Sequence, residues 1–149
     1  TLRDRRLARL MRSCMELPGK QLFQYLDEDG QRRAVSSNDV NLYLREMTGR
    51  DFTAKDYRTW AGSALALERL RKLDASTEAV AKQNLVETVK QVASQLGNTP
   101  AVCPQCYIHP AILQAFSAGE LADVRAARKR KWLSAEEVAL LAFLRKAAG

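Results

Sequence analysis

The chain has 149 residues, of which 46% are hydrophobic, so it falls within the size range of one domain and can build a core. It has no run of about 18 apolar residues and no basic start followed by an apolar run, which argues against a membrane helix and a secretory signal. Its 24 Lys and Arg against 17 Asp and Glu give a net charge of +7, which favours a polyanionic partner, although an ordinary solvated basic surface also accounts for it.

Cysteine usage and the first residues bear on where the protein works. The three cysteines are too few and too unevenly spread for a secreted disulfide framework, which agrees with a reducing compartment. We therefore expect a soluble, cytoplasmic protein that folds as a single compact unit. The chain starts at Thr1 instead of Met and enters a helical pattern almost at once, so we interpret it as a piece cut from a longer protein.

The first third of the chain predicts two helices separated by a hairpin. Apolar residues at three- and four-residue spacing over residues 7–14 predict a helix with a basic outer side, ended by a Pro-Gly pair. Residues 21–26 and 32–35 are typical of two short strands, joined by a turn over residues 27–30. Cap residues, apolar spacing and a closing glycine predict the second helix within residues 36–49.

The rest of the chain predicts further helices. Thr53 caps one that runs to Leu70, and the next is capped by Ser76 and runs to Leu96 before a Gly and a Pro stop it. A short helix beyond Pro104 and its extension to residue 116 are expected, and a terminal helix starts at residues 134–137. The predicted fold class is mainly α, with one small β-hairpin.

Arg58 lies in the segment KDYRTW (residues 55–60), in the first turns of a predicted helix. An arginine offers a planar fork of donors to two non-bridging phosphate oxygens, and a helix N-terminus adds positive potential. A phosphate site is one interpretation of this position. A partly buried arginine paired with a carboxylate, such as Asp56 or Glu68, is the competing one.

A second segment makes the first more specific. The run LGNTP (residues 96–100) contains Asn98, and Tyr107 follows nine positions after that asparagine. An Arg in KDxRTW, then LGNTP, then this Tyr together resemble the pattern of type IB DNA topoisomerases of the bacterial and poxvirus-like kind. The resemblance covers the whole chain. It implies the compact helical catalytic core that these enzymes share with tyrosine recombinases.

The resemblance implies that Tyr107 is a nucleophile. A tyrosine hydroxyl can attack a DNA backbone phosphate, which gives a 3′-phosphotyrosyl link and a free 5′-hydroxyl. Because the link stores the phosphodiester energy, strand rotation and religation require neither ATP nor metal, so we expect no cofactor and no metal site. Arg58 would neutralise the charge that builds on the phosphoryl oxygens. The implied partner is double-stranded DNA, bound by a nucleoid-associated monomer.

Two further residues acquire roles from the same resemblance. Asn98 occupies the place where many relatives carry His. Its amide can donate a hydrogen bond to a phosphate oxygen but cannot become cationic or transfer a proton, so we assign it a donor role only. Lys55, one helical turn before Arg58, is expected to contact the DNA backbone beside the scissile phosphate.

Two catalytic residues of the family pattern have no matching position in this chain. The family also has an earlier Arg and a Lys on a β-hairpin, the Lys acting as general acid, and both lie upstream of the segment that matches Thr1. We therefore expect the chain to be the C-terminal part of a catalytic domain, without the N-terminal DNA-clamp domain and the catalytic hairpin. Alone, it should bind DNA weakly and show little or no relaxation activity.

The pair Cys103 and Cys106, with His109 three positions on, invites a zinc or redox interpretation. A structural zinc takes four ligands, and the remaining Cys14 is far away in sequence, so small residues packing around Tyr107 are the favoured interpretation. His109 is expected at a helix end or on the DNA backbone, outside the chemistry.

The densest basic run, residues 125–131, contains Arg128, Lys129 and Arg130. It is either a solvated helix end or a phosphate contact, and the family resemblance favours the contact. Trp60 and Trp132 lie among apolar neighbours and are predicted in the core, not as base-stacking platforms.

Two other functions remain open. Tyrosine recombinases share the nucleophile, but they usually show His-x-x-Arg and Leu-Gly-His, where this chain has Lys55-x-x-Arg58 and an Asn at position 98. A catalytically silent DNA-binding module is the alternative from another class. Trapping a covalent DNA adduct distinguishes the enzymes from the binding module.

Overall fold

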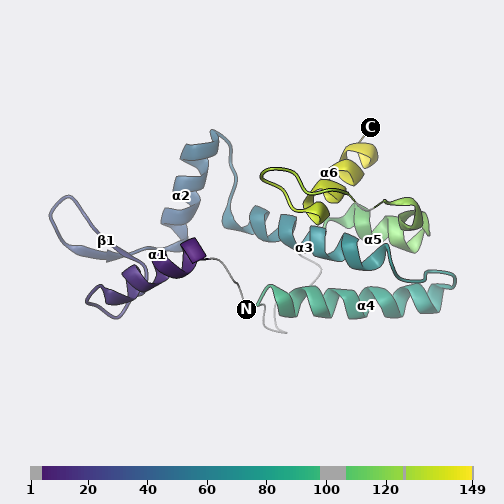
Figure 1. The fold of residues 1–149 in the computed structure, drawn as a ribbon, viewed down its shortest axis with the longest axis horizontal. Coiled ribbons are helices and arrows are strands. Elements are labelled where there is room, and N and C mark those ends of the chain that lie inside the picture. Colours follow the sequence, from purple (N-terminus) through teal and green to yellow (C-terminus); the bar gives the residue numbers. More distant parts are fainter. Residues whose placement is uncertain (1–4, 98–106, 126, 149) are drawn as a thin grey trace. The chain divides into compact units, whose positions relative to one another are not determined.

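The structure is a computed structural model that describes residues 5–97, 107–125 and 127–148. The chain divides into two compact units, Thr1–Ala54 and Lys55–Gly149, where its length and composition had favoured a single one. Figure 1 shows the first unit in purple to blue and the second in teal to yellow. No helix within the described ranges is long and apolar enough to cross a membrane.

The first unit contains two helices and a hairpin. In chain order these are α1 (Arg5–Glu16), β1 (Gln24–Leu26), β2 (Arg32–Ala34) and α2 (Ser37–Thr48). The strands pair antiparallel, with Tyr25 opposite Arg33. The predicted helices and hairpin are therefore confirmed. The strands are shorter than expected, because only three residue pairs are in register.

Asp27 organises the turn of the hairpin. Its carboxylate accepts backbone hydrogen bonds from Gln31 (2.7 Å) and Asp29 (3.2 Å), and Arg33 Nε donates to its other oxygen at 2.8 Å. The bond from Arg33, followed by that from Gln31, lowers the pKa of Asp27. Gly30 takes the positive φ of 72° that closes the turn.

Helix α2 carries the caps that its sequence predicts. The Ser36 side chain accepts from the backbone N–H of Asp39, and the Asp39 carboxylate accepts from the backbone N–H of Ser36, which forms a capping box. Gly49 ends the helix in the left-handed conformation, with φ 64°, and donates its N–H to the carbonyl of Arg45.

The named elements of the second unit are all helices. The unit contains α3 (Ala54–Leu70), α4 (Glu78–Gln95), α5 (Pro110–Ser117), the 3-10 helix η2 (Glu120–Asp123) and α6 (Ala135–Ala147). In Figure 1, α3 and α4 run in opposite directions, so the start of α3 lies at the same end as the close of α4. The mainly α fold class with one small hairpin is confirmed.

The hydrophobic core of the second unit joins all of its elements. Helix α3 supplies Leu67 and Leu70, and α5 supplies Ile112 and Phe116, all at most 1% exposed. Three further side chains complete it from α4, η2 and α6, respectively: Val92, Leu121 and Leu140. Because every helix contributes to one core, the core fixes the spacing between α3, the end of α4 and the segment before α5.

Two element boundaries differ from the sequence prediction. The side chain that caps α4 is Thr77, not Ser76, because Ser76 bonds to the carboxylate of Asp74 in the preceding loop. Tyr107 has 3-10 helical conformation, but the chain leaves it at once and α5 starts afresh at Pro110. A proline at the first helical position lacks the N–H that a continuing helix would need, which explains the break.

Candidate active site

Helix α3 presents a line of residues toward the segment that carries Tyr107. Arg58 is half-buried in its second turn, and Gly62 and Ser63 follow one turn later and are buried. Residues four apart lie above one another on a helix, so Arg58 and Gly62 share a face. The candidate site lies on this face of α3.

Arg58 contacts the two other segments that the sequence singled out. Its Nη2 donates to the carbonyl oxygen of Leu96 at 3.0 Å, and its guanidinium carbon lies 5.1 Å from the centre of the Tyr107 ring. A guanidinium at this distance from an aromatic ring is held by cation–π attraction. The structure therefore brings the predicted nucleophile and the predicted phosphate-binding arginine together.

Backbone contacts hold the Tyr107 segment against α3. The carbonyl of Tyr107 lies so close to Gly62 that a Cβ built on the glycine would approach it within 3.0 Å. Ile108 is 3% exposed, and the N–H of His109 donates to Ser63 Oγ at 2.8 Å. Tyr107 and His109 are thus fixed to α3, and Ile108 between them is buried in the core.

His109 ends this segment as the N-cap of α5. Its Nδ1 accepts a hydrogen bond from the N–H of Ala111 at 3.3 Å, and Pro110 takes the first helical position. The expected place of His109 at a helix end is therefore confirmed. A capping Nδ1 is occupied by the backbone, which agrees with a structural task for the ring.

The remaining predicted residues of the site are placed unevenly. Lys55 is exposed in the first turn of α3, three residues before Arg58. Asn98 lies outside the described residues, as do Cys103 and Cys106. Within the described residues, no group of three His, Cys, Asp or Glu side chains could hold a metal ion.

Glu68, one of the two carboxylates proposed as a structural partner of Arg58, engages other cations. It lies 2.6 Å from Arg71 Nη2 and 2.5 Å from Lys72 Nζ. Burial raises the pKa of Glu68, but the hydrogen bonds from Lys72 and Arg71 lower it more, so the net pKa lies below the ordinary value. Glu68 therefore belongs to an ion-pair cluster at the far end of α3 from Arg58.

An exposed turn, here called the basic turn, spans Arg130–Leu133 at the end of the basic run. Arg130 and Leu133 exchange backbone hydrogen bonds at 2.9 and 3.4 Å, and the turn between them carries Lys131 and Trp132. Trp132 is 84% exposed, with Lys131 Nζ 5.2 Å from its ring, so its predicted place in the core is wrong. Connecting turns run mostly over the protein surface, so a side chain at the tip of one is usually exposed.

Glu137 ties this turn to α3. One carboxylate oxygen of Glu137 accepts from the indole N–H of Trp60 at 2.9 Å, and the other accepts from the backbone N–H of Ser134 at 2.8 Å. Ser134 caps α6 directly after the basic turn, and Trp60 lies two residues after Arg58. Trp60 packs against the core, as expected, through a polar as well as an apolar contact.

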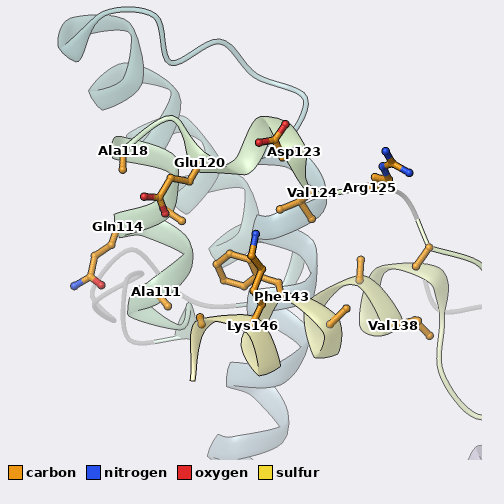
Figure 2. A pocket seen from close by; sticks show the side chains of 15 residues that line it. Ala111, Gln114, Ala118, Glu120, Asp123, Val124, Arg125, Val138, Phe143 and Lys146 are labelled. Atoms are coloured by element: carbon orange, nitrogen blue, oxygen red, sulfur yellow. The ribbon is translucent and has the colours of Figure 1, made fainter. Parts of the chain in front are cut away.

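A separate hollow of about 770 Å³ lies between α5, η2 and α6. Figure 2 shows Phe143 and Lys146 of α6 inside it, with Glu120 and Asp123 of η2 at one rim. Neither Arg58 nor the Tyr107 segment lines it.

Sequence reasoning missed Gly62 and Ser63 as parts of the site, and it gave the Leu96 carbonyl no role although Leu96 opens the LGNTP run. One signal pointed to Gly62, because a glycine inside a helix costs about 1 kcal/mol relative to alanine and therefore asks for a packing reason. The carbonyl of Leu96 carried no signal, since every residue has one.

The sequence of this chain matches a known protein family. Residues 1–132 match the model of the family described as eukaryotic DNA topoisomerase I, catalytic core. The chain belongs to this family. The predicted resemblance to topoisomerases is thereby confirmed. The match covers the first compact unit and the second as far as Trp132, before α6.

A viral topoisomerase is among the similar proteins. The chain is 32% identical over 114 residues to a DNA topoisomerase 1B of Acanthamoeba polyphaga mimivirus. The alignment covers 71% of this chain but 34% of the viral protein, so the chain spans about a third of the length of that relative.

Proposed function

We propose that this chain carries the nucleophile and a phosphate-binding arginine of a type IB DNA topoisomerase. Family membership supports the class of enzyme, and the 5.1 Å between the Arg58 guanidinium and the Tyr107 ring is the observation that carries the assignment. A phosphate that accepts attack from the phenol would lie within reach of the guanidinium.

The proposed reaction is a reversible transesterification. The Tyr107 hydroxyl oxygen attacks a backbone phosphorus, the new phosphotyrosyl bond forms to the 3′ side, and the bond to the 5′-oxygen breaks. The phenol gives up its proton as the new bond forms, and the leaving oxygen takes up a proton to become a 5′-hydroxyl, so no net proton is gained or lost. After strand rotation that hydroxyl attacks the phosphotyrosine, restores the DNA backbone and releases the tyrosine.

In this reaction Arg58 stabilises the transition state. Negative charge grows on the non-bridging oxygens during attack, and a guanidinium meets two such oxygens with parallel hydrogen bonds. Its bond to the Leu96 carbonyl and its contact with the Tyr107 ring hold it half-buried before DNA arrives. A preorganised cation of this kind spends little free energy on reorientation during the reaction.

We assign supporting roles to three further parts of the chain. Asn98 follows Leu96 by two residues and would donate its amide to a phosphate oxygen. Lys55, exposed one turn before Arg58, would contact the DNA backbone. Arg128, Lys129 and Arg130 are all exposed and would bind phosphates of double-stranded DNA through their positive charges.

The proton for the leaving 5′-oxygen is assigned to another part of the protein. A guanidinium stays protonated at physiological pH and is a poor proton donor. The resemblance implies a hairpin lysine for this task. We therefore propose that relaxation requires that part together with this chain.

A nicked suicide duplex tests the proposal. Cleavage releases the short downstream fragment that carries the free 5′-hydroxyl, so religation is blocked and the covalent adduct accumulates as a denaturant-resistant species. We expect the full-length protein to form the adduct and Tyr107→Phe to form none while binding the duplex with nearly unchanged affinity. DNA binding without any adduct from the unaltered protein would favour a silent binding module, and a large loss of affinity in Tyr107→Phe would mark Tyr107 as structural.

A further inference from the structure

We propose that Gly62 and Ser63 are positioning residues that set where Tyr107 stands relative to Arg58. The inference rests on the proposed function, since it assumes that Tyr107 is the nucleophile. Neither residue reaches the phenol oxygen. Both act on the backbone of the segment that carries it.

Gly62 allows the Tyr107 backbone to lie directly on α3. The glycine is buried in the helix interior and its φ is not positive, so its conformation does not demand a glycine. A Cβ at position 62 would come within 3.0 Å of the Tyr107 carbonyl oxygen and within 3.3 Å of its carbonyl carbon. Those are backbone atoms, which cannot rotate away as the end of a flexible side chain can. The close approach therefore explains a residue that costs the helix stability.

Ser63 binds the backbone of the Tyr107 segment at His109. Ser63 is only 2% exposed, and its Oγ accepts a hydrogen bond from the N–H of His109 at 2.8 Å. The buried Ser63 hydroxyl gives the His109 N–H an acceptor, and the bond fixes the backbone of the segment against α3. Between the two contacts, Ile108 is buried in the core.

The same helix also fixes Arg58. Arg58 lies one turn before Gly62, and both meet Leu96: the arginine bonds its carbonyl, and a Cβ on the glycine would lie 3.2 Å from its Cδ1. Helix α3 therefore holds Arg58 and, one turn later, the Tyr107 backbone at a fixed separation. A displacement of about 1 Å between reacting groups can cost on the order of 100-fold in rate, so this spacing matters for catalysis.

Covalent adduct formation on the suicide duplex is the first readout, measured on the full-length protein. We expect Gly62→Ala to slow adduct formation on the order of 100-fold, with the dissociation constant for DNA within about twofold. Ser63→Ala should slow it by about tenfold, and Ser63→Thr, which keeps the hydroxyl, should recover most of the rate. Circular dichroism and thermal unfolding verify that each variant folds.

Two matched controls separate positioning from simple packing. Ala64→Ser adds one atom at a buried neighbour of Gly62 on another face of α3, and Ser94→Ala removes an exposed hydroxyl from α4. Both should form the adduct at the unaltered rate. A packing role would make the rate follow the unfolding temperature across all variants, controls included.

The second readout does not depend on activity. A nuclear Overhauser effect between the Tyr107 ring and the Arg58 side chain reports their proximity, with the ring assigned by its loss in Tyr107→Phe. It should weaken in Gly62→Ala and Ser63→Ala and persist in both controls. If Gly62→Ala does not fold, the Ser63 pair decides.

The two readouts keep the two proposals apart. An unaltered protein that forms no adduct overturns the proposed function, while the ring contact still tests positioning. An unaltered protein that forms the adduct, with Gly62→Ala and Ser63→Ala at the same rate and the same ring contact, overturns the positioning role alone.

Discussion

The guanidinium carbon of Arg58 lies 5.1 Å from the centre of the Tyr107 ring, although one residue comes from a helix and the other from a short segment far along the chain. The core that α3, α4 and α5 share brings the two residues together. The carbonyl of Leu96, which follows α4, accepts a hydrogen bond from Arg58 and fixes its position. Chemistry at a phosphate needs an aligned nucleophile and a cation, and this pair supplies both residue types.

Removal of Arg58 should affect chemistry more than DNA binding. Arg58→Ala is expected to lower the rate of adduct formation by on the order of 100-fold or more, because the transition state loses a preorganised cation. Arg58→Lys should recover only part of the rate, since an ammonium cannot meet two oxygens in parallel. Single-turnover cleavage measures this; equal rates for Arg58→Ala and the unaltered protein would show that the arginine has no catalytic role.

The ion-pair cluster at the end of α3 should make stability depend on pH. The pKa of Glu68 is lowered on folding, so its contribution is present above the ordinary value of 4.5 and is lost as the pH falls through that value and below. Glu68→Gln should therefore lower the unfolding free energy by roughly 0.5 to 1 kcal/mol at pH 7 and by much less near pH 3. Denaturant unfolding at the two pH values measures the difference. Glu120→Gln, at an exposed position, is the control.

The bond between Trp60 and Glu137 should couple α3 to the start of α6. A double-mutant cycle with Trp60→Phe and Glu137→Ala is expected to give a coupling energy of about 1 kcal/mol, because the indole N–H bonds to a carboxylate at 2.9 Å in a partly buried place. Urea unfolding of the four proteins measures it. Strict additivity of the two changes would mean that the bond contributes nothing to stability.

Fluorescence should distinguish the two tryptophans. Trp132 is 84% exposed and Trp60 is partly buried, so acrylamide should quench mainly Trp132, and Trp132→Phe should remove most of the quenchable emission. If the basic turn binds DNA, an added duplex should protect Trp132 from acrylamide, and raising the salt concentration should reverse the protection. Unchanged quenching at saturating DNA would place the turn outside the interface.

Local signals in the sequence accounted for much of the fold. The helices predicted from apolar spacing are present in the structure. Ser36 and Ser134 form capping boxes with the acidic residues three positions later, Asp39 and Glu137. These are short-range interactions, so the residues that make them lie close together in the sequence. The same holds for the hairpin turn at Asp27.

Long-range contacts could not be predicted in this way. The approach of the Tyr107 carbonyl to Gly62 and the bond from Arg58 to the Leu96 carbonyl depend on how three helices pack, which no local pattern specifies. Trp132 shows the converse, because its apolar neighbours in sequence suggested burial while the tight turn places it in solvent. The pairing of Arg58 with Tyr107 in one site was inferred from the family resemblance.

Mapping the covalently linked residue tests the central claim most directly. The chain has four tyrosines, Tyr25, Tyr43, Tyr57 and Tyr107, and each could in principle carry a DNA phosphate. After trapping the full-length protein on the suicide duplex, nuclease and protease digestion followed by mass spectrometry identifies the modified peptide. We predict a phosphotyrosyl nucleotide on Tyr107 and on none of the other three; a link to any other residue, with Tyr107 unmodified, would contradict the account.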